Sequence, residues 1–254
     1  MRRPVDPEVL KLMLAALPNV AFDGWSNSTF VAACREADIS ERKARLFCPR
    51  GALDLAIAFH KWGDDQFETA FKKKKISELK VREKIRKAVE LRIKLASDKE
   101  AVRRGVVLFA LPIHAFEGSR LIWDTSDLIW ELIGDNTEDF NWYSKRAILS
   151  AVYASTVLYW LGDNSEGSEE TWHFLDRRIE DVMKFETAKL QLKTNKFTKE
   201  FPYNSIRYCL AEEKLKISDL DAITFGWNPS AHMNSYNEQF SRTRILRENN
   251  LYSM

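Results

Sequence analysis

One long apolar segment constrains the fold of this chain more than any other feature of its sequence. Residues 139–161 open with aromatic and cationic side chains and continue as an almost uniformly apolar run. A helix that is apolar on all sides is buried on all sides in a soluble protein, so this segment predicts the axis of a helical core. The opening of the run is more typical of a contact surface, because it combines Trp142, Tyr143, Lys145 and Arg146.

The composition narrows the class of protein. The chain has 254 residues, 45% of them apolar and 12% aromatic, which is enough for one large domain or two ordinary ones. Its formal net charge is only +2, so the protein as a whole has no strong positive electrostatic field that would attract nucleic acid or an anionic membrane. The most apolar stretch, residues 105–113, is interrupted by Pro112 and is far shorter than the roughly 20 residues that span a bilayer. We therefore expect a cytoplasmic protein without a membrane-spanning helix.

Caps, prolines and apolar spacing predict helices over most of the chain. Asp6 before Pro7 is a helix start, and Pro18 is expected to end that helix. Ser168 is expected to cap the last long helix, which has Glu169 and Glu170 in its first turn. These patterns predict an all-α fold, with helices over residues 7–17, 28–37, 40–47, 52–62, 72–104, 99–111, 118–133, 142–161 and 168–193.

The predicted helices 28–37 and 40–47 have the spacing of a helix-turn-helix. The second helix carries cations that could contact DNA: Arg42, Lys43 and Arg45. Acidic side chains crowd the same turn and would face phosphates unfavourably: Glu36, Asp38 and Glu41. Many helical bundles share this spacing, so both a DNA-binding regulator and a helix-turn-helix without that role fit the residues.

Residues 72–104 are strongly basic, with 14 Lys or Arg against five Asp or Glu. Ile85, Val89 and Ile93 recur every four residues, which predicts an amphipathic basic helix. A solvated face explains such a segment. An anionic membrane surface or an acidic partner is the alternative.

The predicted helices 118–133 and 142–161 interleave small residues with large apolar ones. Small residues either let two helices approach closely or leave a lipid-sized cavity between them. The four histidines lie in separate elements, and no phosphate-binding loop, nucleophile elbow or paired cysteine motif is present. We therefore expect no catalytic residue, no metal site and no cofactor.

The order of several motifs resembles a known family. The motifs are Leu17-Pro-Asn-Val-Ala-Phe-Asp-Gly-Trp25, Leu46-Phe47 with Gly51-Ala-Leu-Asp-Leu55, Lys80-Val-Arg-Glu-Lys-Ile85, Ala110-Leu-Pro112, Asp139-Phe-Asn-Trp-Tyr-Ser-Lys-Arg146 and Thr171-Trp-His-Phe-Leu-Asp-Arg-Arg-Ile179. Together they resemble the ubiquinone-biosynthesis accessory family called coenzyme Q nine, over about residues 5–193.

The resemblance implies a TetR-like helical bundle with a degenerate helix-turn-helix that does not bind nucleic acid. It implies a non-enzymatic bacterial protein that has no cofactor, holds a bound isoprenoid or phospholipid and supports the quinone-pathway hydroxylase. Such a protein would lie peripherally on the inner face of the inner membrane, and TetR-like folds suggest a homodimer. The partner-facing residues would be Trp142, Tyr143 and Arg146. The lipid-binding residues would be Leu121, Ile122, Ile129, Leu149, Val152 and Tyr153. The residue patterns alone also fit a TetR-type transcriptional regulator.

The tail differs in character from the rest. Residues 201–229, which contain one predicted strand at 217–226, resemble an early stretch of the NodU-type carbamoyltransferases, without that family's metal motif. We therefore expect a helical domain over residues 1–193 and an incomplete, poorly ordered α/β-like fragment over residues 194–254.

Overall fold

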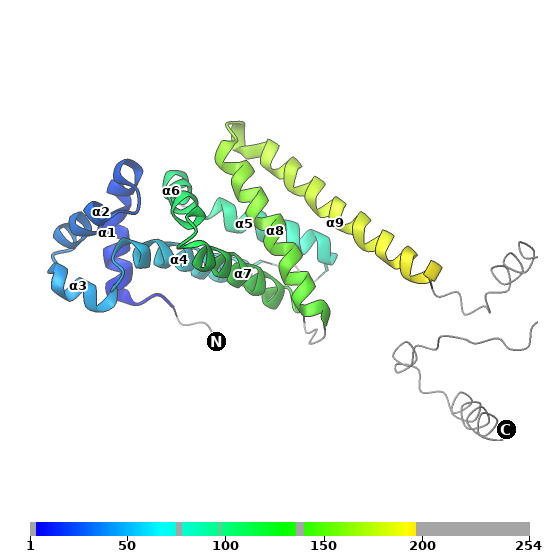
Figure 1. Cartoon of the computed structure of the whole chain (residues 1–254). Coiled ribbons are helices and arrows are strands. Elements are labelled where there is room, and N and C mark those ends of the chain that lie inside the picture. Colours follow the sequence, from blue (N-terminus) through cyan, green and yellow to red (C-terminus); the bar gives the residue numbers. More distant parts are fainter. Residues whose placement is uncertain (1–3, 75–77, 97, 136–139, 197–254) are drawn as a thin grey trace, which may run out of the picture. The chain divides into compact units, whose positions relative to one another are not determined.

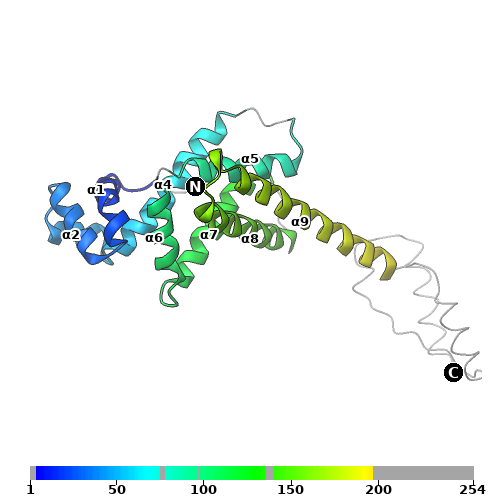
Figure 2. The ribbon, with the colours of Figure 1, turned by 90° about the horizontal axis from the view of Figure 1, so that it is seen from above.

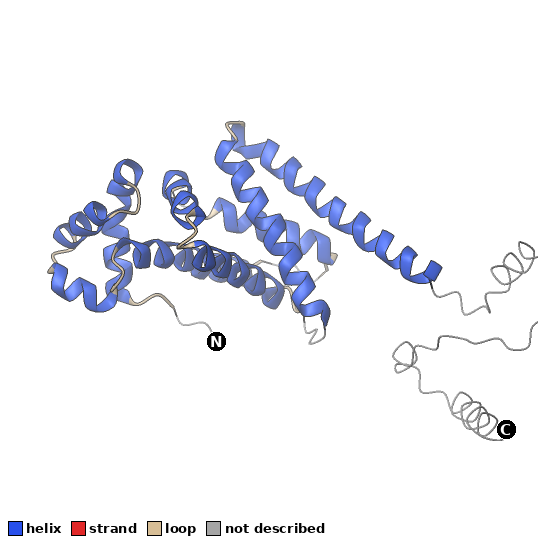
Figure 3. Ribbon diagram, viewed as in Figure 1, coloured by secondary structure: helices blue, strands red, loops and turns tan. Residues whose placement is uncertain are grey.

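The computed structural model describes residues 4–74, 78–96, 98–135 and 140–196 (Figure 1). All regular structure in these ranges is helical, so the predicted all-α class is confirmed (Figure 3). The helices are α1 (Pro7–Asp23), α2 (Asn27–Glu36), α3 (Glu41–Phe47), α4 (Ala52–Lys72), α5 (Val81–Lys94), α6 (Lys99–Ala110), α7 (Ala115–Leu132), α8 (Phe140–Gly162), the 3-10 helix η1 (Glu166–Ser168) and α9 (Glu169–Lys196).

The chain divides between Leu192 and Lys193 into two units, and α1–α8 with most of α9 belong to the first. The predicted strand 217–226 and the rest of the carbamoyltransferase-like fragment from residue 197 lie outside the described residues. The domain boundary expected at residue 193 stays a prediction.

Local capping explains where several helices begin. The Asp6 carboxylate accepts a hydrogen bond from the backbone N–H of Glu8 at 2.9 Å, with Pro7 in the first turn, as the sequence predicts. In α2 the Ser26 hydroxyl accepts from the Thr29 N–H at 3.3 Å.

The prediction that Pro18 ends the first helix is wrong, because α1 continues through it to Asp23. A proline inside a helix costs roughly 3 kcal/mol. The extra turn offsets this cost by carrying Val20 into the core, where its side chain is fully buried. Gly24, at φ 66°, then ends the helix.

The basic segment 72–104 is not one helix as predicted. Its first residues complete α4, which is ten residues longer than the predicted helix 52–62, and the remainder divides into α5 and α6. The break before α6 is a capping site, where the Asp98 carboxylate accepts from the Ala101 N–H at 2.9 Å. In α5, Val89 and Ile93 are buried in the core, whereas Arg82 and Lys87 are exposed.

Two hydrophobic clusters form the core of the first unit, and α4 contributes to both. Leu55 of α4 packs with α1–α3, whereas Phe67 and Phe71 pack with α5, α7, α8 and α9. Figures 1 and 2 show the same arrangement from two sides, with α1–α3 at one end, α5 and α8 at the other, and α4 and α6 between them.

Helix α8 corrects the expectation that the apolar run is buried on all sides. One face is buried through Leu149, Val152 and Tyr153, but Leu158 and Tyr159 are 57% and 37% exposed. The Tyr159 ring stacks on Phe174 of α9 at 4.5 Å, so part of the outward face is covered only by a neighbouring ring.

The cap of α9 is also not the predicted Ser168. The Asp163 carboxylate accepts from the hydroxyl and the N–H of Ser165, at 2.6 and 2.8 Å, and from the hydroxyl and the N–H of Thr171, at 2.5 and 2.9 Å. These hydrogen bonds favour the charged carboxylate and lower the pKa of Asp163 well below its ordinary value.

Candidate functional site

A cavity of about 340 Å³ lies where α4, α5, α6, α7 and α8 meet. Its walls are mainly apolar, and aromatic side chains supply much of them: Trp25, Phe59, Trp62, Phe109 and Trp160. Small residues such as Ala56, Ala101 and Gly105 leave the space that these rings do not fill. Such a volume is near the lower end of the range of about 300–1,000 Å³ that is typical of small-molecule sites.

The predicted lipid-binding residues divide between three environments. Leu121, Ile122 and Tyr153 line this cavity. Leu149 and Val152 line a second groove of about 710 Å³ between α5, α8 and α9. Ile129 is fully buried in the hydrophobic core and lines neither space.

The cavity opens beside the connection between α6 and α7, where its lining residues Ala110, Ala115 and Ser119 are exposed. Large apolar side chains in this connection and in the helix turns beside it also face solvent. Ile113 and Phe116 are each 77% exposed, and Val107 is 62% exposed. Exposed apolar surface of this kind is typical of an interaction site.

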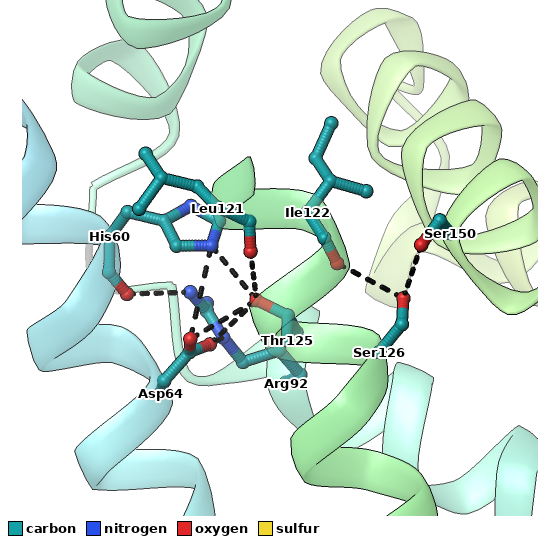
Figure 4. A network of polar contacts seen from close by, with 8 residues as sticks. All are labelled: His60, Asp64, Arg92, Leu121, Ile122, Thr125, Ser126 and Ser150. Atoms are coloured by element: carbon teal, nitrogen blue, oxygen red, sulfur yellow. Dashed lines mark hydrogen bonds and ion pairs between the residues drawn. The ribbon is translucent and has the colours of Figure 1, made fainter. Parts of the chain in front are cut away.

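A buried ion pair joins Arg92, which lines the cavity, to Asp64, which does not (Figure 4). Arg92 of α5 donates from Nε to the Asp64 carboxylate of α4 at 2.8 Å, and both side chains are 6% exposed. Arg92 also donates from Nη2 to the His60 carbonyl at 3.0 Å. Because a lone buried charge is costly, the two residues are stable here only as a pair.

Thr125 of α7 connects this ion pair to His60. The Thr125 hydroxyl lies 2.9 and 3.1 Å from the two Asp64 oxygens and 2.9 Å from Nε2 of His60 (Figure 4). A hydroxyl has one proton, so when Thr125 donates to Asp64 it accepts from the N–H of His60. The network thus holds the His60 ring in the cavity wall.

Tyr153 of α8 completes the polar part of the lining, which also includes His60 and Arg92. Burial raises the pKa of the Tyr153 phenol, and the nearby Arg92 charge offsets part of that rise. Burial also opposes the charged form of Arg92, but interactions with Tyr153 and Asp64 raise its pKa overall. The phenol is therefore neutral and the guanidinium charged at physiological pH.

Sequence reasoning missed this network because its members come from three helices that are far apart in the chain. A signal was present, however. His60 and Asp64 share the spacing of the buried Phe67 and Phe71, so a charged side chain falls on the apolar face of α4. Such a residue is rarely buried without a partner.

The predicted partner-facing residues lie together at the start of α8 but differ in exposure. Tyr143 is 62% exposed, and its ring contacts Trp142 edge-on at 4.7 Å. Arg146 is only 3% exposed. Its guanidinium lies 3.8 Å from the centre of the Trp142 ring, and its Nε donates to Asp127 at 2.6 Å. Arg146 therefore supports Trp142 from beneath the surface.

The helix-turn-helix forms as predicted, and cations of its second helix have partners within the chain. Arg45 bonds Glu41 at 2.8 Å and Asn27 at 3.1 Å. Lys43 lies 3.3 Å from Glu8 of α1. Among the described residues, no cluster of three or more His, Cys, Asp or Glu could hold a metal ion.

Residues 115–186 match the COQ9 family model. This part of the chain is therefore similar to the COQ9 family. The matched segment begins at the first residue of α7 and ends within α9, so it contains Thr125, Trp142 and Tyr153. Arg92, which lines the cavity, and its partner Asp64 lie before this segment.

Mitochondrial ubiquinone biosynthesis proteins named COQ9 are similar to most of the described chain. Those of Rattus norvegicus and Homo sapiens are 29% and 28% identical over 192 residues, which is 72% of this chain and 61% and 60% of theirs. The Xenopus tropicalis protein is 30% identical over 190 residues, again 60% of its length. The resemblance inferred from the motifs is confirmed. The chain spans about three fifths of the length of these curated relatives.

A TetR transcriptional regulator from Nitrosomonas europaea ATCC 19718 has a similar solved structure. Its TM-score to this chain is 0.56 at 20% sequence identity, and the match covers 69% of this chain and 97% of the regulator. At this identity the likeness shows the fold alone. The predicted TetR-like all-α fold is therefore confirmed.

Proposed function

We propose that this protein is a non-catalytic accessory protein of ubiquinone biosynthesis that holds an isoprenoid lipid or a phospholipid in the cavity between α4 and α8. The observation that carries the proposal is an apolar cavity of about 340 Å³ partly walled by the segment that matches the COQ9 family model. The names of the COQ9 relatives support the pathway.

The polar residues of the cavity support a carrier rather than a catalyst. Asp64, Thr125 and His60 are the residue types of a nucleophilic site, but Thr125 and Asp64 do not line the cavity. The Thr125 hydroxyl lies within hydrogen-bond distance of both oxygens of the Asp64 carboxylate. It is therefore not placed to attack a bound ligand.

The partner in this proposal is the hydroxylase of the quinone pathway, which would contact Trp142 and Tyr143. The exposed phenol ring of Tyr143 and the Trp142 ring beside it form the kind of aromatic pair that dominates protein interfaces. Arg146 would act through Trp142, because its own side chain is buried.

We also place the protein peripherally on an anionic membrane. Among the described residues, no helix is long and apolar enough to cross a bilayer. The exposed cations Lys72, Lys73, Lys74 and Arg82 would attract anionic lipid.

A homodimer is part of the same proposal. The partly exposed apolar face of α8, with Leu158 and Tyr159, supports it. Leu158 also lines the cavity, so the test uses Tyr159. Analytical ultracentrifugation of the full chain and of Tyr159→Glu tests the dimer, since the variant should shift a dimer towards monomer.

Native mass spectrometry of the full chain, purified gently from a quinone-producing host, tests lipid binding. We expect masses of the protein plus one isoprenoid or phospholipid. A clean apo spectrum under conditions that preserve a known lipid-protein complex would contradict the proposal. Pull-down of the hydroxylase by the full chain, compared with Trp142→Lys, tests the partner surface.

A TetR-type regulator is the second candidate, favoured by the fold likeness and the helix-turn-helix. The intrachain partners of Arg45 and Lys43 oppose it, because cations bonded to Glu41 and Glu8 are less available to DNA phosphates. A gel shift with DNA from upstream of the gene tests this candidate. Salt-sensitive binding to one palindromic sequence would support it.

A further inference from the structure

The groove of about 710 Å³ between α5, α8 and α9 shares no lining residue with the cavity, among the residues that the structure describes (Figure 1). Apolar side chains from all three helices supply much of its lining, including Ile85, Ile148, Val152, Ile179 and Val182. We propose that this groove binds an acidic amphipathic helix of another protein, with the apolar face of that helix against α8 and its acidic side chains beside Lys80 and Arg82. The inference goes beyond the proposed function and requires no lipid in the cavity.

The groove is open to solvent along part of its length. Val81 and Met183 line it, and they are 56% and 49% exposed although both side chains are apolar. A lipid chain in an open groove would leave part of its own apolar surface in water. An amphipathic helix instead buries its apolar face and keeps its polar face in water, so it matches an open groove better.

The walls of the groove are helices, which favours a helical partner over an extended one. Backbone groups inside α5, α8 and α9 bond within their own helices, so an extended peptide would find no backbone partners there. The length also suits a helix. From Ser144 to Val152, α8 spans about 12 Å, and apolar anchors at positions i and i+7 of a partner helix lie about 10.5 Å apart.

The charges that line the groove are positive. Its charged lining residues in the described part of the chain are Lys80, Arg82 and Lys145, without an Asp or Glu. Lys145 pairs with Asp135 at 2.7 Å. Lys80 and Arg82 are exposed, and no ion pair joins either of them to a carboxylate of the described ranges.

The charges around these two cations do not cancel them. Glu83 offsets part of the charge at the start of α5, but its carboxylate accepts from the backbone N–H of Lys80 at 3.2 Å and does not line the groove. On α9, charged side chains pair with one another: Arg178 with Asp181 at 2.8 Å, and Lys184 with Glu180 at 3.2 Å. The α5 side of the groove therefore stays positive, and complementary charge selects an acidic partner.

Three helical peptides of roughly 15 residues test the proposal on the full chain by fluorescence anisotropy. The first carries leucines at i, i+3, i+4 and i+7 with two glutamates beside this stripe. The second has lysines in place of the glutamates, and the third keeps the glutamates but distributes the leucines around the helix. We expect the first peptide to bind at least about tenfold more tightly than either of the others. Equal affinity of the first peptide and either of the others, or no binding at all, would overturn the proposal.

Arg82→Glu is the test variant, because it reverses a charge at the groove and places an acid in the first turn of α5, where the helix dipole favours it. We expect it to weaken binding of the first peptide at least about tenfold and to strengthen binding of the lysine peptide. Lys87→Glu is the matched control, since Lys87 is exposed on the same helix and does not line the groove. Equal losses from both variants would show that net charge, not the groove, attracts the peptide.

Two other occupants give different results. If a monomeric short-chain phosphatidylglycerol displaces the first peptide, the groove is a lipid site. If the peptide dissociates a dimer of the full chain in analytical ultracentrifugation, the groove holds a second copy. Either result would overturn the proposal. The membrane placement proposed above also uses Lys72, Lys73 and Lys74, so it does not fail together with this inference.

Discussion

Gly63 makes room for the guanidinium of Arg92. A Cβ atom at residue 63 would lie 2.7 Å from Nη2 of Arg92 and 2.9 Å from its Cζ, closer than real contacts allow. The guanidinium cannot move aside without lengthening its hydrogen bond to Asp64. We expect Gly63→Ala to destabilise the protein by about 1–3 kcal/mol, measured by urea denaturation.

Gly105→Ala is the matched control for this effect. Gly105 is also helical and also lines the cavity, but a Cβ there would meet only Trp25 Nε1, at an ordinary 3.7 Å. Alanine is the better helix former, so this variant should gain up to about 1 kcal/mol. Equal losses from both variants would show that the Arg92 contact is not the cause.

Removing one partner of the Asp64–Arg92 ion pair should destabilise the protein more than removing both partners. Arg92→Met leaves a buried carboxylate without its cation, and we expect a loss of about 3–5 kcal/mol. The double variant Asp64→Leu with Arg92→Met should recover most of this loss, because Thr125 can still donate to the Leu121 carbonyl at 3.1 Å. Urea denaturation of both single variants and of the double variant completes a double-mutant cycle, which measures the interaction free energy between Asp64 and Arg92. An additive double loss would contradict the account.

The sequence predicts features that depend on neighbouring residues, but it does not predict which charged side chains pair in the core. Local chemistry predicted the start of α1 at Asp6 and Pro7, because a cap depends on neighbours in the chain. The continuation past Pro18 and the pairing of Asp64 with Arg92 depend on tertiary burial. The apolar run of α8 was predicted as a helix, but its exposed face was not, since composition alone does not say which neighbours cover it.

Variants of Tyr143 and Arg146 should distinguish a residue that contacts a partner from one that stabilises the fold. Tyr143→Ala removes an exposed ring, so unfolding free energy should change by less than about 0.5 kcal/mol. Arg146→Ala removes the cation beneath Trp142 and the bond to Asp127, and should cost about 1–3 kcal/mol. If the proposed hydroxylase partner is correct, both variants should weaken its binding in a pull-down. A stability loss in Tyr143→Ala as large as that in Arg146→Ala would refute this division of roles.

Asp163 should make the stability of the protein depend on pH in the acidic range. Hydrogen bonds from the side chains of Ser165 and Thr171 lower its pKa, so its contribution is full above the unfolded value of about 3.9 and is lost as pH falls towards the folded value. Asp163→Ala should be less stable than the unmodified chain at pH 7, and the difference should shrink as pH falls from 4 towards 2. Thermal unfolding followed by circular dichroism measures it. Ser168→Ala, at the position that sequence reasoning favoured as the cap, should show no such pH-dependent difference.

The participation of α4 in both hydrophobic clusters has a consequence for how the first unit unfolds. Leu55 packs in one cluster and Phe67 in the other, and both belong to α4. If α4 unfolds or moves, both clusters lose packing, so we expect the two clusters to unfold together. We therefore expect that the helix-turn-helix end does not fold independently. Calorimetry should give one cooperative transition for residues 4–196, and a fragment cut within α4 should leave neither half folded.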